Sequence, residues 1–140
     1  MAFLLILAVL PGCTTIPSSQ TSQLPLETTT WNLISYMDTN GKMTDVIQDS
    51  DVTAVFSNGG ISGNAGCNSY FGDYEITGSE ITIGPVGSTL MYCESTGLME
   101  QEFAYIADLG SAESYSITGS MLILADEAGN PVLVYSGIST

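Results

Sequence analysis

The chain has 140 residues, which is enough for one domain, and fifteen acidic residues against a single basic one, Lys42, give a formal net charge of −14. This charge excludes nucleic-acid binding, because that binding requires cationic side chains to displace counterions from phosphates. Anionic lipid headgroups are disfavoured as partners for the same reason. Hydrophobic residues make up 44% of the chain, with seven Tyr, four Phe and one Trp among them, so the sequence can still build a core.

The first twelve residues are predicted to be a signal peptide. The apolar run Ala2–Leu10 is too short to cross a bilayer, which takes about 20 helical residues, and it has the length of a signal-peptide core. The run leads into Leu-Pro-Gly-Cys at residues 10–13, which resembles a lipobox, the site where lipoprotein signal peptidase cleaves. Pro11 stands where Ala or Ser is usual, and no basic residue precedes the run.

The lipobox resemblance implies that Cys13 receives a diacylglycerol on its sulfur and becomes the first residue. Residues 14–23 are polar, uncharged and low in complexity, so we assign 13–27 to the lipidated cysteine and a flexible tether. The protein is therefore expected to be extracytoplasmic and anchored by its lipid to the cell membrane or envelope. The alternatives are an ordinary signal peptide or a buried N-terminal strand.

From residue 28 onward, short strand signals alternate with turn signals. Thr28–Tyr36 is rich in β-branched and aromatic residues around Trp31, and residues 51–56 alternate with the period of two that is typical of a strand. Turns are predicted at 38–42, which contains Asn-Gly, and at 57–60.

Two later stretches, 74–83 and 115–124, have similar sequences, and each is predicted to form a hairpin around a Gly-Ser turn. Convergence on one good turn explains the similarity more simply than an internal duplication does. A last hairpin is predicted to turn at 127–130 and continue as a strand over 131–135.

One segment has helical spacing. Residues 97–109 are predicted to form a helix that is capped by Ser95 or Thr96 and ended by Gly110. Its apolar stripe is interpreted as core packing and comprises Leu98, Met99, Phe103, Ile106 and Leu109. The sequence thus predicts a mainly β (α+β) fold, an antiparallel sheet with one helix laid against it.

Several short motifs occur, one after another, along this β-rich part of the chain. They comprise Trp31 in a Trp-x-Leu pair, a central block with Gly63, Gly66, Cys67, Asn68, Tyr70, Gly72 and Tyr74, then Thr89, Met91 and Cys93, and finally Glu100 and Phe103. This pattern resembles the META domain, the family of the heat-shock protein HslJ, over roughly residues 28–136, and we assign 28–140 to this domain. The resemblance implies a small, partly open antiparallel β-barrel with one helix packed against it. Members are often exported lipoproteins whose biochemical activity is unassigned.

The motif residues also have a direct physical interpretation. The three glycines allow the backbone to bend or to approach a neighbour closely. Asn68 can hydrogen-bond to nearby backbone, and Tyr70, Gly72 and Tyr74 lie on one face of a strand.

The chain has three cysteines, so lipidation of Cys13 leaves the pair Cys67 and Cys93. In an exported domain a disulfide is the favoured interpretation, and it would contribute about 3.5 kcal/mol in the chain-entropy model. The alternatives are two free buried thiols or a metal site, although two cysteines without histidine do not complete a zinc shell.

Catalytic and metal chemistry finds little support. The absence of histidine excludes Ser-His and Cys-His pairs, and a Ser-Lys pair would have to use Lys42 in a predicted turn. Carboxylate pairs, as in glycoside hydrolysis, are conceivable among fifteen acids. Asp45, Asp49 and Asp51 could surround a Ca²⁺ ion but lack EF-hand spacing, so a solvated acidic loop is favoured. We predict no catalytic residue, no metal site and no cofactor.

These observations favour an exported, lipid-anchored META-domain envelope protein with a binding, assembly or stress-related role rather than an enzyme. Its expected partners are the membrane, through the lipid, and an unknown envelope protein or small ligand. The alternative hypotheses are a carboxylate-based glycan hydrolase and a Ca²⁺-stabilised surface module.

Overall fold

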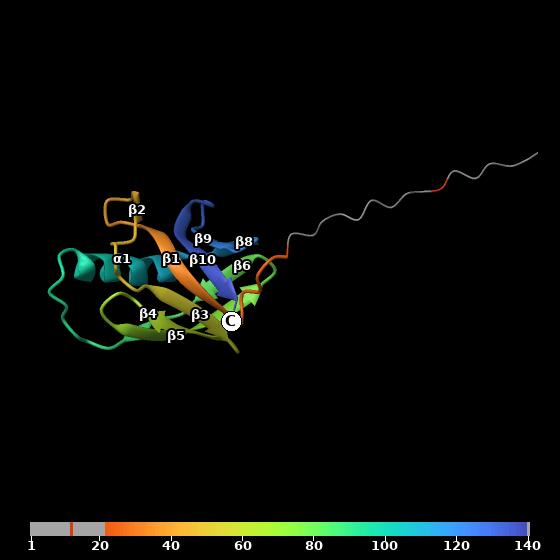
Figure 1. The fold of residues 1–140 in the computed structure, drawn as a ribbon. Helices are drawn as coiled ribbons and strands as arrows, with labels where there is room; N and C mark the ends of the chain where they lie inside the picture. The colour runs from red at the N-terminus through yellow and green to blue at the C-terminus, as the bar shows by residue number, and fades with distance from the viewer. Residues whose placement is uncertain (1–11, 13–21, 140) are drawn as a thin grey trace, which may run out of the picture.

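The computed structural model describes Gly12 and residues 22–139, so Cys13 lies outside the described residues, as do most of the predicted signal peptide and tether. The elements are β1 (Thr29–Met37), β2 (Met43–Asp45), β3 (Thr53–Ser57), β4 (Gly60–Asn64), β5 (Ser69–Thr77), β6 (Glu80–Ile83), β7 (Gly87–Ser88), α1 (Leu98–Ser111), β8 (Ser114–Thr118), β9 (Met121–Ala125) and β10 (Pro131–Ser139) (Figure 1). Within this part of the chain, no helix has the length and apolar character of a membrane span.

Eight of these strands form a closed antiparallel barrel in the order β10-β9-β8-β6-β5-β4-β3-β1, because β1 also pairs with β10. The β1–β10 ladder is long, running from Thr29↔Ser139 to Tyr36↔Leu133. The shortest strand pairing in the barrel is β6–β8, which consists of the single pair Glu80↔Ser114. There the chain leaves the barrel to form β7 and α1, while β2 is a short addition on β1. The predicted antiparallel barrel with one helix is confirmed, and the β1–β10 ladder closes it where a partly open barrel was expected.

The core lies inside the barrel because side chains alternate between the two faces of each strand. β9 illustrates the pattern, since Leu122 and Leu124 are fully buried while Met121 faces outward. Other fully buried side chains are Trp31, Phe56, Ile61, Leu133 and Tyr135. The two similar hairpins are also present, and they turn at Gly78 and Gly119, which have φ of 62° and 59°. Glycine adopts these positive φ values at little cost.

α1 packs against β1, β10 and β6, but its buried face differs from the predicted one. The residues that it buries are Leu98, Gln101, Glu102, Ala104, Tyr105, Asp108 and Leu109. Phe103, predicted to be in the core, is 70% exposed, so that expectation is wrong. The helix turns a polar strip inward because its side chains hydrogen-bond to backbone N–H groups of other segments.

The helix ends also differ from the predicted ones. The N-cap residue is Gly97, at φ 80°, and no side chain caps the helix, so neither Ser95 nor Thr96 has the predicted role. Gly110 lies inside the helix, which continues to Ser111. At the other end of the domain, Leu24 donates its N–H to the carbonyl of Gly119 at 2.9 Å, so contact with the barrel begins a few residues before position 28.

Candidate functional site

An exposed apolar loop stands out on the surface between β7 and α1. We call residues 89–93 the clamped loop, and its three central side chains are Leu90, Met91 and Tyr92, with exposed fractions of 95%, 59% and 79%. Phe71 on β5 and Phe103 on α1 are also largely exposed. Most exposed apolar residues occur singly, so several large ones in one region indicate an interaction surface.

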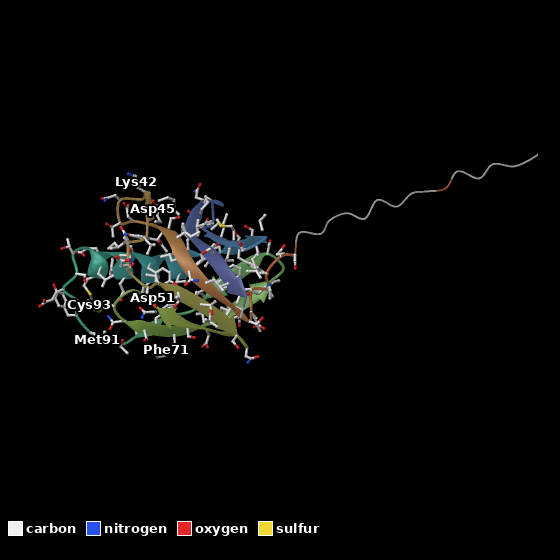
Figure 2. All side chains as sticks on the ribbon, in the orientation of Figure 1. Lys42, Asp45, Asp51, Phe71, Met91 and Cys93 are labelled. Atoms are coloured by element: carbon white, nitrogen blue, oxygen red, sulfur yellow. A yellow bond between two sulfur atoms is a disulfide. The ribbon has the colours of Figure 1, made fainter. Side chains whose placement is uncertain are left out.

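The five side chains, which we call the apolar patch, come from three neighbouring segments. β7 pairs with β5, and the ring of Phe71 lies so close to Gly87 that a Cβ there would be 2.9 Å from it. The next residue, Ser88, lines a shallow pocket together with Phe103. Figure 2 shows Met91 and Phe71 along the same edge of the domain.

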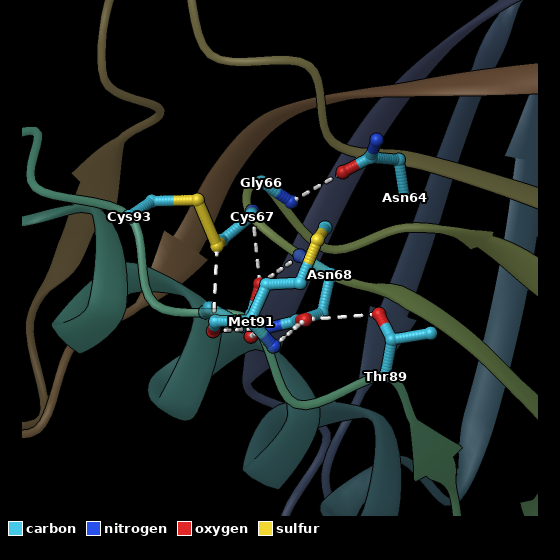
Figure 3. Close-up of a disulfide and its surroundings, with 8 residues drawn as sticks. Asn64, Gly66, Cys67, Asn68, Thr89, Met91 and Cys93 are labelled. Carbon is cyan, nitrogen blue, oxygen red and sulfur yellow. Dashed lines mark hydrogen bonds between the residues drawn. A yellow bond between two sulfur atoms is a disulfide. The ribbon is translucent and has the colours of Figure 1, made fainter.

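The buried side chain of Asn68 holds the clamped loop in place (Figure 3). Its Oδ1 accepts hydrogen bonds from the Thr89 hydroxyl at 2.9 Å and from the Met91 N–H at 2.7 Å. Its Nδ2 donates to the Met91 carbonyl at 3.1 Å. The amide therefore pairs with the Met91 backbone much as a neighbouring strand would, and at the start of the loop the Thr89 N–H donates to the Ser69 carbonyl of β5 at 3.0 Å.

Glu102 on α1 fixes the position of Asn68. Its Oε2 accepts the backbone N–H groups of Cys67 and Asn68 at 2.9 and 2.7 Å, and its Oε1 accepts from Asn68 Nδ2 at 2.6 Å. The Asn68 amide thus turns its NH₂ group toward Glu102, which accepts from it, and its oxygen toward the Thr89 and Met91 donors of the loop.

A disulfide closes the far end of the loop. Cys67 is bonded to Cys93, with their Cα atoms 5.8 Å apart, as the favoured interpretation of the sequence expected. Just before it, Gly66 adopts φ of 116° and donates its N–H to Asn64 Oδ1 at 2.8 Å. The bond and the Asn68 contacts thus tie the clamped loop at both ends.

Two clusters of motif residues serve different purposes. Gly66, Cys67, Asn68, Thr89, Met91 and Cys93 come together in the clamp. Glu100 does not join them, because it is exposed, and the acid that does is Glu102. Glu102 was not among the predicted site residues, although it lies at helical spacing from the buried Leu98, Tyr105 and Leu109.

The remaining motif residues belong to the core. Trp31 is fully buried, and Tyr70 and Tyr74 share the inner face of β5 as predicted. The Tyr70 hydroxyl donates to the Thr53 carbonyl and lies 2.7 Å from the Tyr105 hydroxyl. Burial raises the pKa of Tyr70, and burial together with a hydrogen bond to Glu27 raises the pKa of Tyr74 to about 12, so both phenols stay neutral.

Two motif glycines mark close approaches. A Cβ at Gly63 would collide with the backbone of Thr53, and one at Gly72 would lie 3.3 Å from the side chain of Val86. These positions therefore set how closely neighbouring segments pack.

The alternative sites have less support. Asp45, Asp49 and Asp51 form no metal-binding group, and the described residues contain no cluster of three or more His, Cys, Asp or Glu that could hold a metal ion. Asp108 and Asp126 do line one cavity, as a carboxylate-based hydrolase would require. However, one oxygen of Asp126 already accepts two backbone N–H groups of its own turn, and the pair by itself assigns no reaction.

A closed antiparallel barrel whose helix holds a surface loop defines a small β-barrel domain. The META domain family matches residues 24–136, and the chain belongs to this family. Neither this family nor the similar structures point to catalysis.

The similar solved structures share the fold. A protein from Burkholderia xenovorans, solved by NMR, is 23% identical, with a TM-score of 0.68 and 96% of each chain covered. A second NMR structure is 22% identical, with a TM-score of 0.56, and covers 79% of this chain and 89% of its own. A DUF4847 family protein from Bacteroides vulgatus is 15% identical, with a TM-score of 0.56, and covers 82% and 96%. No curated protein is significantly similar to this sequence.

Proposed function

We propose that this protein is an exported, lipid-anchored META-domain protein that docks onto another envelope protein through its apolar patch. The observation that carries the proposal is the clamp, in which the buried Asn68, Glu102 and the disulfide hold an apolar loop open to water. Burying one large apolar side chain is worth about 1.5–3 kcal/mol, so the exposed loop is unfavourable until a partner covers it.

The rigidity of the loop favours docking. Association loses free energy when flexible segments become ordered, and a loop that is fixed beforehand avoids that loss. Aromatic residues and Met are also enriched in the cores of protein–protein interfaces. The patch consists of two Phe, one Tyr, one Met and one Leu.

The charge around the patch indicates what kind of partner fits. Exposed acids lie beside its members, with Asp73 two residues from Phe71 along β5, Glu94 after the clamped loop and Glu100 one helical turn from Phe103. A second copy of this chain would bring a net charge of −14 against −14. The proposed partner is therefore a protein with an apolar recess bordered by Lys or Arg side chains.

The geometry of the domain is compatible with an anchor. The described chain enters at residue 22 on the side of the domain opposite the clamped loop (Figures 1 and 2). A lipid on Cys13 would hold the domain at a membrane while the patch faces away from the attachment point. Mass spectrometry of the membrane-extracted protein tests the anchor, and an unmodified chain that begins before Cys13 would refute it.

Docking is tested by placing a photo-crosslinking residue at Tyr92 in intact membranes, with the same residue at the exposed Ile138 as a control. We expect position 92 to capture one protein whose contact surface is basic. The cross-link should disappear with Leu90→Ser and weaken in 0.5 M NaCl, since salt screens charge complementarity. Cross-links only to lipid, or the same products from position 138, would refute the docking surface.

A further inference from the structure

A second surface feature lies between two hairpin turns of nearly identical geometry. In the β1–β2 turn, Asp38 Oδ1 accepts the N–H groups two and four residues later, and Gly41 has φ of 77°. In the β9–β10 turn, Asp126 Oδ1 does the same, and Gly129 has φ of 82°. Both turns project on the same side of the barrel (Figure 1) and border a cavity of about 620 Å³.

A buried carboxylate from α1 lines this cavity. Asp108 is only 7% exposed, and its Oδ2 accepts the Met37 N–H at 2.9 Å. Its Oδ1 accepts no hydrogen bond from the described residues. No fully buried side-chain N or O atom in the described part of the chain lacks a hydrogen-bond partner, so Oδ1 is not fully buried and is open to the cavity that Asp108 lines. A carboxylate oxygen that is open to a cavity can accept a hydrogen bond from a ligand or pair with a cation.

The surroundings favour a positive charge. Asp108 lies in the last turns of α1, where the helix dipole is negative, and the last turn contains no basic residue. Asp126 is a second carboxylate on the same cavity, and Asp38 is close enough to raise the pKa of Asp108. Lys42 lies in the exposed β1–β2 turn, where its backbone N–H donates to Asp38 and, to a smaller extent, its charge lowers the pKa of that carboxyl.

The remaining walls are mainly apolar. They are formed by Met37, Met43, Pro131 and Val132, with Ser111 and Asn130 as the neutral polar groups. A bare metal ion does not suit such walls, and the described part of the chain offers no group of three acidic ligands. A cation that carries an alkyl chain can pair with the carboxylates and also pack against the apolar side chains.

We propose that this cavity binds the alkylammonium group of a small organic amine, with Asp108 as the counter-ion and the methionines against the alkyl chain. This site is separate from the docking patch and does not depend on the proposed docking function.

The titration of Asp108 gives the site a pH signature. Burial, more than the neighbouring Asp38, raises the pKa of this carboxyl to about 7, while the bond from Met37 opposes the rise. Tyr36 stays neutral because burial and the two acids raise the pKa of its phenol. Only the ionised carboxylate attracts an ammonium group, so affinity should increase as the pH rises from about 6 to 8.

NMR titration of the folded domain with three probes at constant ionic strength tests the proposal. The probes are n-butylammonium, which has both the charge and the chain, ammonium ion, which has only the charge, and 1-butanol, which has no charge. We expect n-butylammonium alone to shift the amide signals of Met37 and Asn130 with saturation. Equal signal shifts with ammonium ion would show that only the charge is attracted, as in a general counterion atmosphere. Equal shifts with 1-butanol would show that binding does not depend on the charge of Asp108. Either result would overturn the proposal.

Two variants localise the binding. Asp108→Asn and Asp126→Asn should each weaken n-butylammonium binding at least tenfold, whereas Glu75→Gln, which removes one exposed charge outside this cavity, should change it less than twofold. The amide of Asp108→Asn can still accept the Met37 N–H, so the fold should persist, and the amide spectrum of the variant reports this directly. Equal affinity in Asp108→Asn and Glu75→Gln would refute the site.

Discussion

Three buried polar residues of α1 attach other segments of the chain to the helix. Gln101 Oε1 accepts the Ile47 N–H at 2.7 Å, Glu102 accepts the backbone before β5, and Asp108 accepts the end of β1. Both carboxylate oxygens of Glu102 accept hydrogen bonds, whereas Asp108 uses only one of its two oxygens. This difference separates a structural carboxylate from one that is available to a ligand.

Glu102→Gln should destabilise the protein by about 2–3 kcal/mol. The Gln oxygen can accept the two backbone N–H groups, but its NH₂ group would then face Asn68 Nδ2, another donor. Asn68 cannot reverse its amide without losing the Thr89 and Met91 bonds to Oδ1. Urea unfolding measures the loss. Glu100→Gln, which removes one exposed charge two residues earlier, should change stability by less than about 0.5 kcal/mol, and equal losses would contradict the clamp.

Asp108→Asn should stabilise the protein at pH 8 and leave its stability unchanged at pH 4. In the folded state the pKa of Asp108 is about 7, against an ordinary value of 3.8, so the folded protein binds an extra proton between these values. The contribution of Asp108 to the free energy of unfolding therefore falls as the pH rises from about 4 to 7, and the variant lacks this contribution. The gain at pH 8 should be about 1–2 kcal/mol after solvent screening.

Urea unfolding at a series of pH values measures this effect. Asp51→Asn, at an exposed acid, should retain the slope of the natural protein. Parallel curves for the natural protein and Asp108→Asn would show that this carboxyl is not the source of the slope.

At the scale of elements, glycine decides where strands and loops approach one another. Gly63 lies on β4 where a Cβ would be 2.7 Å from the carbonyl carbon of Thr53, whereas a Cβ at Gly110 in α1 would meet nothing within 4 Å. The two positions therefore predict opposite effects of one added methyl group.

Gly63→Ala should destabilise the domain by about 2 kcal/mol or more, because backbone must move to accept the methyl group. Gly110→Ala should stabilise it by about 0.5–1 kcal/mol, since alanine loses less entropy in a helix. Thermal and urea unfolding of the two variants compare them directly, and a loss of stability in both would argue against the packing described for α1.

The sequence predicted which segments form strands and helices more readily than which face of each element is buried. Period-two alternation and Gly-Ser turns located the β5–β6 and β8–β9 hairpins, since both signals are local. The stripe that included Phe103 predicted the helix but not its inward face. That face was decided by Gln101, Glu102 and Asp108, whose backbone partners are 34 to 71 residues away along the chain.

At the scale of the whole molecule, one basic residue cannot neutralise fifteen acids, so repulsion among carboxylates opposes the compact state. Raising NaCl from 0.02 to 0.3 M should increase the melting temperature by about 3–6 °C, since salt screens this repulsion. Differential scanning calorimetry measures the change, with neutral sucrose as a control for general solute effects. A melting temperature that does not depend on salt would show that the acids are already well separated.

Alternation and turn glycines are visible along the chain, so the sequence by itself predicted an antiparallel sheet with one helix. The barrel and the family followed from the resemblance of its motifs to the META domain, and the cysteine count favoured the Cys67–Cys93 pairing. The lipid on Cys13 stays a prediction from the lipobox resemblance at residues 10–13. Only the tertiary structure decided that Glu102 rather than Glu100 completes the clamp, that Phe103 faces water, and that Asp108 and Asp126 share a cavity. Each of these depends on which residues distant in the chain become neighbours, and burial and hydrogen bonding fix that only when the barrel closes.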